Sequence, residues 1–309
     1  MSYLSSVTKG KVVEPIFAII YGVPGIGKST TVSEGANPLF LGDAKESSHL
    51  GVSRLPEPKT FQEAKDQVRE LIGEKALKFK TLAIDNLGFL ENLIFQEVCK
   101  DNNKPTIESI GYGKGYKEAV QKHLEFIACL SDLRKSKGMD IVIIGHSKVK
   151  TFQDPTTTSG YDRYQVSINE EAANAWYRSV DAILFMNYEV LKTSDDDKRA
   201  VGAGVRVMFT QERPSFQAKN RYGLPFRMVM PLGESWKTIK DAIKTGEPEG
   251  IESLSAEISG LLANVKDPEL TKKVGDALVA ANGNAVKLTA IKDRLVAVIG
   301  GLKLSLIHI

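Results

Sequence analysis

The chain has 309 residues, with 42% hydrophobic and 26% charged residues, values typical of a globular protein with one large domain and a small appendage. Its net charge of +3 is too small to indicate nucleic-acid binding by bulk electrostatics, so any such binding must come from local patches. Cys99 and Cys129 indicate neither a disulfide framework nor a zinc site, and no apolar run is long enough to span a membrane, so we expect a cytoplasmic protein without a membrane partner.

The first predicted element is a buried strand, residues 16–21, followed by Gly22-Val23-Pro24-Gly25-Ile26-Gly27-Lys28-Ser29-Thr30 and a helix over residues 29–34. Strand, glycine-rich loop and helix form the context in which G-x-x-x-x-G-K-[ST], the Walker A motif, makes a phosphate-binding P-loop. Backbone N–H groups of such a loop surround a polyphosphate. We expect Lys28 to neutralise β- and γ-phosphate oxygens and Ser29 to bind Mg²⁺. The pattern predicts a nucleoside triphosphate site.

Two more predicted strands follow the P-loop unit. Pro38 to Leu41 is a short apolar run, and residues 42–50 form a polar loop at its end. After a helix that begins with a capping box at Thr60, the apolar run Thr81 to Asn86 ends in an acid. A strand that ends in aspartate after a P-loop unit is the Walker B pattern. We expect Asp85 to hold the hydration shell of Mg²⁺, although turns favour aspartate on their own.

The connection from Gly111 to Tyr116 interleaves glycines with tyrosines and a lysine. Two interpretations stay open: Tyr112 and Lys114 stack on bases and touch phosphates, or the tyrosines of a flexible loop cover neighbouring core. A helix is expected next, with an apolar face formed by Val120, Leu124, Ile127 and Leu130.

Asp140 to His146 predicts another buried strand of the parallel type. In a parallel sheet His146 faces the nucleotide edge, where it senses the γ-phosphate or positions water; a plain hydrogen-bonding histidine is the alternative. Residues 147–164 predict a long polar loop, and such loops tend to be functional or mobile. Beyond them we expect a helix over 169–178, strands over 180–188 and 205–210, and a charged tip over 192–204 between these strands.

The composition predicts an ATPase core over residues 1–244, a linker over 245–250 and a small helical region over 251–303. Three short amphipathic helices in that region form either a cap on the core or a docking surface. The last six residues, 304–309, read like one translated frame of a common sequencing adapter. We therefore expect them to be an artefact and exclude them from the fold.

With these motifs in place, the chain resembles the RecA-like P-loop ATPases of phages that are grouped with AAA-type nucleotide-binding proteins. More narrowly, it is similar to the phage single-strand annealing proteins with a minimal RecA core. The resemblance covers about residues 16–232. Besides the two Walker motifs it rests on more specific segments: Gly111 to Tyr116, Ile143 to Ser147, Tyr161 to Tyr164 and Lys219 to Gly223. It implies an α/β fold with a mostly parallel central sheet flanked by helices, and an ATP- and Mg²⁺-dependent role on single-stranded DNA in recombination.

The resemblance also implies partners. ATP would bind between subunits of a ring or filament, and Lys219 and Arg221 would enter the site of a neighbour, where an arginine stabilises charge on the phosphoryl oxygens. A solvated basic turn is the alternative for both residues. The loops over 147–164 and 192–204 match the DNA-binding loops of the family, and a single-strand binding protein is a further partner. The phosphate contacts expected there are Lys148, Lys150 and Arg163.

One segment departs from the family pattern. RecA-like ATPases usually carry a glutamate just after the second strand, which activates the attacking water. Here the segment Gly42-Asp43-Ala44-Lys45-Glu46 leaves the register ambiguous, so Glu46 or Asp43 is the expected general base. We expect slow, DNA-stimulated ATP hydrolysis. The alternatives are a hexameric helicase or loader-like motor, a small-molecule kinase, which would need an arginine lid, and an ATP-gated DNA-binding scaffold without hydrolysis.

Overall fold

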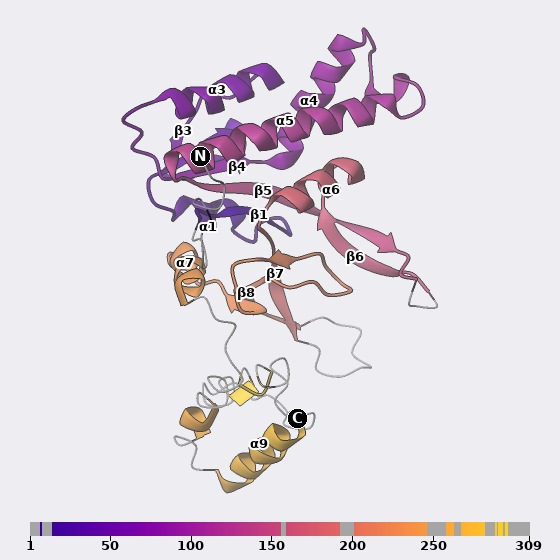
Figure 1. Ribbon diagram of the computed structural model, residues 1–309. Helices are drawn as coiled ribbons and strands as arrows, with labels where there is room; N and C mark the ends of the chain where they lie inside the picture. The colour runs from indigo at the N-terminus through magenta and orange to yellow at the C-terminus, as the bar shows by residue number, and fades with distance from the viewer. Residues whose placement is uncertain are drawn as a thin grey trace. The chain divides into compact units, whose positions relative to one another are not determined.

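A computed structural model describes residues 7, 14–155, 159–191, 201–245, 258–262, 267–281, 288, 290–292 and 294–295. The chain forms two compact units, Met1–Lys244 and Thr245–Ile309 (Figure 1). All residues of the predicted sites lie in the first unit. No helix in the described part of the chain has the length and apolar character needed to cross a bilayer. Most of the predicted linker and the suspected adapter segment lie outside the described residues.

The first unit is built on one ten-stranded sheet, as far as the chain is described. Its parallel strands, in spatial order, are β7 (Ala182–Leu191), β1 (Phe17–Gly22), β5 (Asp140–Phe152), β4 (Thr81–Asp85), β2 (Pro38–Gly42) and β3 (Ser53–Arg54). Antiparallel strands complete it: β8 (Val201–Phe209), β10 (Arg227–Val229), β6 (Tyr161–Val166) and β9 (Lys219–Asn220). Because β1, β4 and β5 are parallel neighbours, the loops that follow them meet at one edge of the sheet.

Helices cover both faces of this sheet, and the side chains of β1 alternate between the two cores. Phe17, Ile19 and Tyr21 pack toward one face, while Ala18 and Ile20 pack toward the other. Figure 1 shows the helices of the first face: α3 (Phe61–Gly73), α4 (Leu87–Asp101), α5 (Lys114–Lys137) and α6 (Glu170–Ser179). The opposite face carries α1 (Lys28–Ser33) and α7 (Ser235–Thr245), and two short helices, α2 (Ala44–Ser47) and η2 (Ile107–Ser109), lie in connections. The predicted fold class is confirmed.

Within the range 147–164, predicted as a long polar loop, residues 147–152 and 161–164 form the strands of an antiparallel hairpin instead. Strand β5 continues past the core to Phe152 and pairs with β6, and we call this hairpin the β5–β6 arm (Figure 1). Its two outermost pairs are polar or aromatic: Thr151 donates to Asp162 at 2.9 Å, and the rings of Phe152 and Tyr161 lie 5.7 Å apart. The prediction was wrong because a hairpin that extends away from the core lacks the apolar alternation of a half-buried strand.

Two other predictions need correction. Leu124, assigned to the buried face of α5, is 39% exposed, because α5 packs against three helices and buries His123 and Phe126 instead. Strand β7 also runs past its predicted end at residue 188 to Leu191, and β8 begins inside the predicted charged tip, at Val201; residues 192–200 lie outside the described part.

The second unit contains α9 (Pro268–Ala281) and a small apolar cluster. The cluster draws residues from all three predicted amphipathic segments: Ile258, Leu270, Val274, Leu288, Ile291 and Leu295. Leu254, Val265 and Val298, which complete the predicted apolar faces, lie outside the described residues.

Candidate functional site

The predicted P-loop connects the fully buried strand β1 to α1. Gly25 and Gly27 have φ of 74° and 92°, in the left-handed region that glycine adopts without strain. Gly22 is needed for a different reason, since a Cβ there would lie 2.0 Å from the carbonyl oxygen of Met186 on β7. The glycines therefore allow both the tight turn and the close approach of the neighbouring strand.

Lys28 lies folded over its own loop. Its side-chain amine donates to the carbonyl oxygens of Gly22 and Val23, both at 3.1 Å, and the residue is 7% exposed. Burial lowers the pKa of Lys28, while the nearby carboxylates of Asp85 and Glu46 raise it. A phosphate oxygen can replace these carbonyls as the partner of the ammonium group, which then gains a charge-assisted contact.

Asp85 ends β4 beside the P-loop and is 2% exposed. Burial raises its pKa to about 6, and a hydrogen bond from Ser29 opposes the shift. Its Oδ2 is buried and has no hydrogen-bond partner within the described structure. A hydroxyl next to a carboxylate with an unpaired oxygen is a donor set that suits Mg²⁺, which binds few protein ligands and keeps water and phosphate oxygens as the others. The predicted pair, Ser29 and Asp85, fits this ion.

Glu46, Asn86 and His146 meet at the same sheet edge, although Glu46 lies on α2 after β2, Asn86 follows β4 and His146 lies within β5. The side-chain amide nitrogen of Asn86 lies 3.1 Å from Oε1 of Glu46 and 3.2 Å from Nε2 of His146. The imidazole and the carboxylate of this group lie 3.4 Å apart. Asp43, the other expected base, instead caps α2 by accepting from the backbone N–H of Lys45 at 2.8 Å. Of the two acids, Glu46 is therefore the one placed beside His146.

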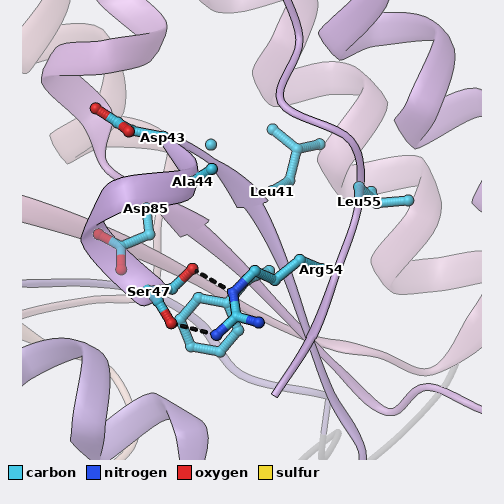
Figure 2. Close-up of a pocket in the computed structure, with 9 residues that line it drawn as sticks. Leu41, Asp43, Ala44, Ser47, Arg54, Leu55 and Asp85 are labelled. Atoms are coloured by element: carbon cyan, nitrogen blue, oxygen red, sulfur yellow. Dashed lines mark hydrogen bonds between the residues drawn. The ribbon is translucent and has the colours of Figure 1, made fainter. Parts of the chain in front are cut away.

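A small hollow lies next to Asp85 and is shown in Figure 2. It has an empty volume of about 200 Å³, and its walls come mainly from the end of β2 and from α2. Arg54 closes one side by donating to the hydroxyl and to the backbone carbonyl of Ser47. These bonds tie the short helix α2, which carries Glu46, to β3.

Arg206 on β8 contacts the P-loop and was missed by the sequence reasoning. Its guanidinium donates to the carbonyl oxygens of Ile26 at 3.3 Å and Met230 at 2.8 Å. A Cβ at Gly27 would lie 2.3 Å from the same guanidinium, which shows how closely the arginine packs on the loop. No sequence pattern indicates this contact, because Arg206 belongs to no recognisable motif and lies 180 residues from its partner Ile26. The arginine holds the loop from β8.

Lys219 and Arg221 lie away from the nucleotide site of their own chain. Strand β9 pairs with the amino-terminal end of β7, whereas the P-loop follows the carboxyl end of β1. The Lys219 amine donates to the carbonyls of Tyr177 and Val180 at 2.7 and 2.6 Å, so it caps the end of α6. This placement does not fit the lysine predicted to enter a neighbour. Arg221 is exposed, with a 3.4 Å contact to Asp181, and its role in a neighbour stays a prediction.

The β5–β6 arm carries the three cations predicted to contact DNA; Lys150 is exposed, Lys148 is half-buried and Arg163 is buried. Lys148 donates to the carbonyl of Ile168, and Lys150 forms a 2.6 Å ion pair with Glu170. The side chain of Lys150 is 48% exposed. An exposed ion pair of this kind contributes about 0–1 kcal/mol, so a phosphate can displace the carboxylate.

Arg163 does not fit the predicted phosphate contact. It is 5% exposed, pairs with Glu212 and lies over the ring of Phe152 at 5.1 Å. Its guanidinium is thus enclosed within the arm, and a phosphate would have to displace the carboxylate of Glu212, which is 61% exposed, to reach it. We assign Arg163 to the packing of the arm.

The tyrosines of the Gly111 to Tyr116 connection have different environments. Tyr112 is fully exposed with φ of 55°, an uncommon conformation for a residue with a side chain. Lys114 begins α5, is 70% exposed, and lies 3.6 Å from Glu118. Tyr116 packs edge-on against Phe95, which matches the core-covering interpretation for this ring alone. Tyr112 and Lys114 remain open to a ligand.

Comparison with known proteins adds one match. A family model described as an AAA domain matches residues 14–222, a range that contains β1, β4, β5 and all of the predicted site residues. No curated protein matches the chain in sequence.

Proposed function

This chain belongs to the AAA domain family, since the match covers more than half of its length, and from that premise we propose an ATPase that acts on single-stranded DNA in recombination, by annealing or strand exchange. AAA family membership suggests ATPase activity, with nucleotide bound at the P-loop. The DNA substrate and the recombination role rest on the sequence resemblance and on the placement of the β5–β6 arm.

The observation that carries the proposal is the meeting of P-loop, buried acid and candidate base at one sheet edge. In this proposal the loop and Lys28 would hold the β- and γ-phosphates, and Ser29 and Asp85, which are hydrogen-bonded to each other, would hold Mg²⁺. The ion would neutralise charge that develops on the phosphate oxygens. Glu46, which lies next to His146, is the group that would take a proton from the attacking water.

The DNA role is supported by the continuity of β5. His146 lies at the nucleotide edge, and Lys148 and Lys150 follow on the same strand as it enters the arm. Because β5 is one continuous strand that is paired with β6, a shift of its backbone at His146 on nucleotide binding would also move the arm. Phosphate contacts by the exposed Lys150 and the half-buried Lys148 would be sensitive to salt.

The test is to measure ATP turnover with and without single-stranded DNA, together with annealing of complementary oligonucleotides. Turnover that DNA stimulates, accompanied by annealing, supports the proposal. Directional unwinding would indicate a motor instead, and turnover indifferent to DNA would indicate a kinase. ATP-dependent DNA binding without turnover would indicate a scaffold, and each of these three results would overturn the proposal.

Self-association completes the proposal, because Arg221 cannot reach the nucleotide of its own chain. Its side chain is 59% exposed. In a ring or filament with a heterologous interface, such an arginine would meet the site of the next copy. Turnover per molecule should therefore rise with protein concentration, which dilution measurements can check.

A further inference from the structure

Asn86 occupies the centre of the group formed with Glu46 and His146. It is 6% exposed, whereas the side chains of Glu46 and His146 are 37% and 43% exposed. A buried amide thus contacts two accessible groups that come from α2 and β5. The side chains of Glu46 and His146 are each held in part by Asn86 from a different element.

The orientation of the Asn86 amide is set from the other side. Its Oδ1 accepts from the backbone N–H of Phe89 at 3.0 Å and so caps α4. The NH₂ end must then face Glu46 and His146. Its two hydrogens suffice for both contacts, to Oε1 of Glu46 and to Nε2 of His146.

We propose that Asn86 is a positioning residue for ATP hydrolysis, which holds Glu46 as the general base beside His146. The inference rests on the proposed function. Oε1 of Glu46 is engaged by the amide, so Oε2 is the oxygen assigned to water. In the step, a water proton moves to Oε2, the water oxygen bonds to the γ-phosphorus, and the bond to the β–γ bridging oxygen breaks, which leaves its electron pair on ADP.

A purely structural role for Asn86 makes a different prediction. If the residue served only as the cap of α4, any side chain that accepts from Phe89 would replace it. Serine is as good a cap as asparagine but is too short to reach Glu46. Asn86→Ser therefore separates the cap from the contact with the base.

The experiment measures kcat, KM for ATP and the melting temperature in four proteins: wild type, Asn86→Ser, Glu46→Gln and the double variant. The proposal expects Asn86→Ser to lower kcat about 30-fold or more, with KM within about threefold and the melting temperature within about 2 °C. In the Glu46→Gln background the same change should alter kcat by less than about twofold, because its target is already gone.

A matched control is available on the same helix. Asn102 caps the other end of α4, away from Asn86. Its side-chain amide donates to Oε2 of Glu118 at 2.6 Å. Asn102→Ser removes an asparagine–glutamate bond of the same kind and should leave kcat unchanged.

Three results would overturn the inference. Asn86→Ser with wild-type kcat would assign the residue to the cap, and an equal loss of kcat in the Glu46→Gln background would show that it does not act through Glu46. A loss in Asn102→Ser of the same size would show that the effect is a general one on α4. If the wild type binds ATP but never hydrolyses it, the proposed function fails, and the inference fails with it. If the wild type hydrolyses ATP and only the variants behave differently from expectation, the inference alone fails.

Discussion

His123 lies in the core of the ATPase unit, and its burial predicts a loss of stability in mild acid. The residue is 0% exposed on α5, and Trp176 donates its indole N–H to Nδ1 at 3.1 Å. Burial lowers the pKa of His123 from 6.5 to about 4. The folded state therefore keeps the imidazole neutral, and protonation would place a hydrogen against the indole N–H.

The sign and size of the effect follow from linkage. In the unfolded chain the imidazole of His123 binds a proton near pH 6.5, and in the folded chain only near pH 4. Through this residue the free energy of unfolding is therefore highest above about pH 6.5 and falls as the pH drops from 6.5 to 4. The free energy of unfolding should drop by about 2 kcal/mol between pH 8 and pH 5 through this residue alone, and by about 3.4 kcal/mol below pH 4.

The assay compares urea unfolding of the wild type and His123→Gln from pH 8 to pH 5. Tryptophan fluorescence reports this unit, because Trp176 and Trp236 are the two tryptophans of the chain and both lie in it. The variant should be less stable at pH 8, and the difference should shrink by about 2 kcal/mol at pH 5. Glu91, whose Oε1 is 3.9 Å from His123, is present in both proteins. A difference that stays constant with pH would refute the reasoning.

Three further predictions concern the site. Asp85→Asn should abolish Mg²⁺-dependent turnover. Because the change removes a buried charge, it should stabilise the metal-free protein at pH 7.5 by up to about 3 kcal/mol and so raise its melting temperature. A melting temperature below that of the wild type in EDTA would contradict this. Arg206→Lys should weaken ATP binding about tenfold in a fluorescent-nucleotide titration, since lysine cannot bridge the P-loop carbonyl of Ile26 and the carbonyl of Met230 as the guanidinium does, whereas Arg227→Lys, a half-buried control on β10, should not. Arg221→Ala should leave ATP binding by the dilute protein unchanged but lower turnover at high concentration, and an equal loss of both would count against a role in a neighbour.

The nucleotide site could be predicted because its parts are local. A buried strand, a glycine-rich turn and a helix start are contiguous from residue 16 to residue 33, so the pattern contains the backbone geometry that holds phosphate. Asp85 could be placed for a similar reason, since the carboxyl ends of parallel strands lie at the same sheet edge, and only β5 separates β4 from β1. Near-continuous apolar strands likewise indicate a sheet covered on both faces.

What only the tertiary structure decided is which distant side chains meet. The choice of Glu46 over Asp43 depends on the turn of α2, and the contacts of Asn86 join residues 40 and 60 positions away. Arg163 was expected at the surface because a lone arginine gives no sign of the ring and carboxylate that enclose it. Contacts of this kind are set by strand order and hairpin pairing, and these are global properties that periodicity within one segment does not contain.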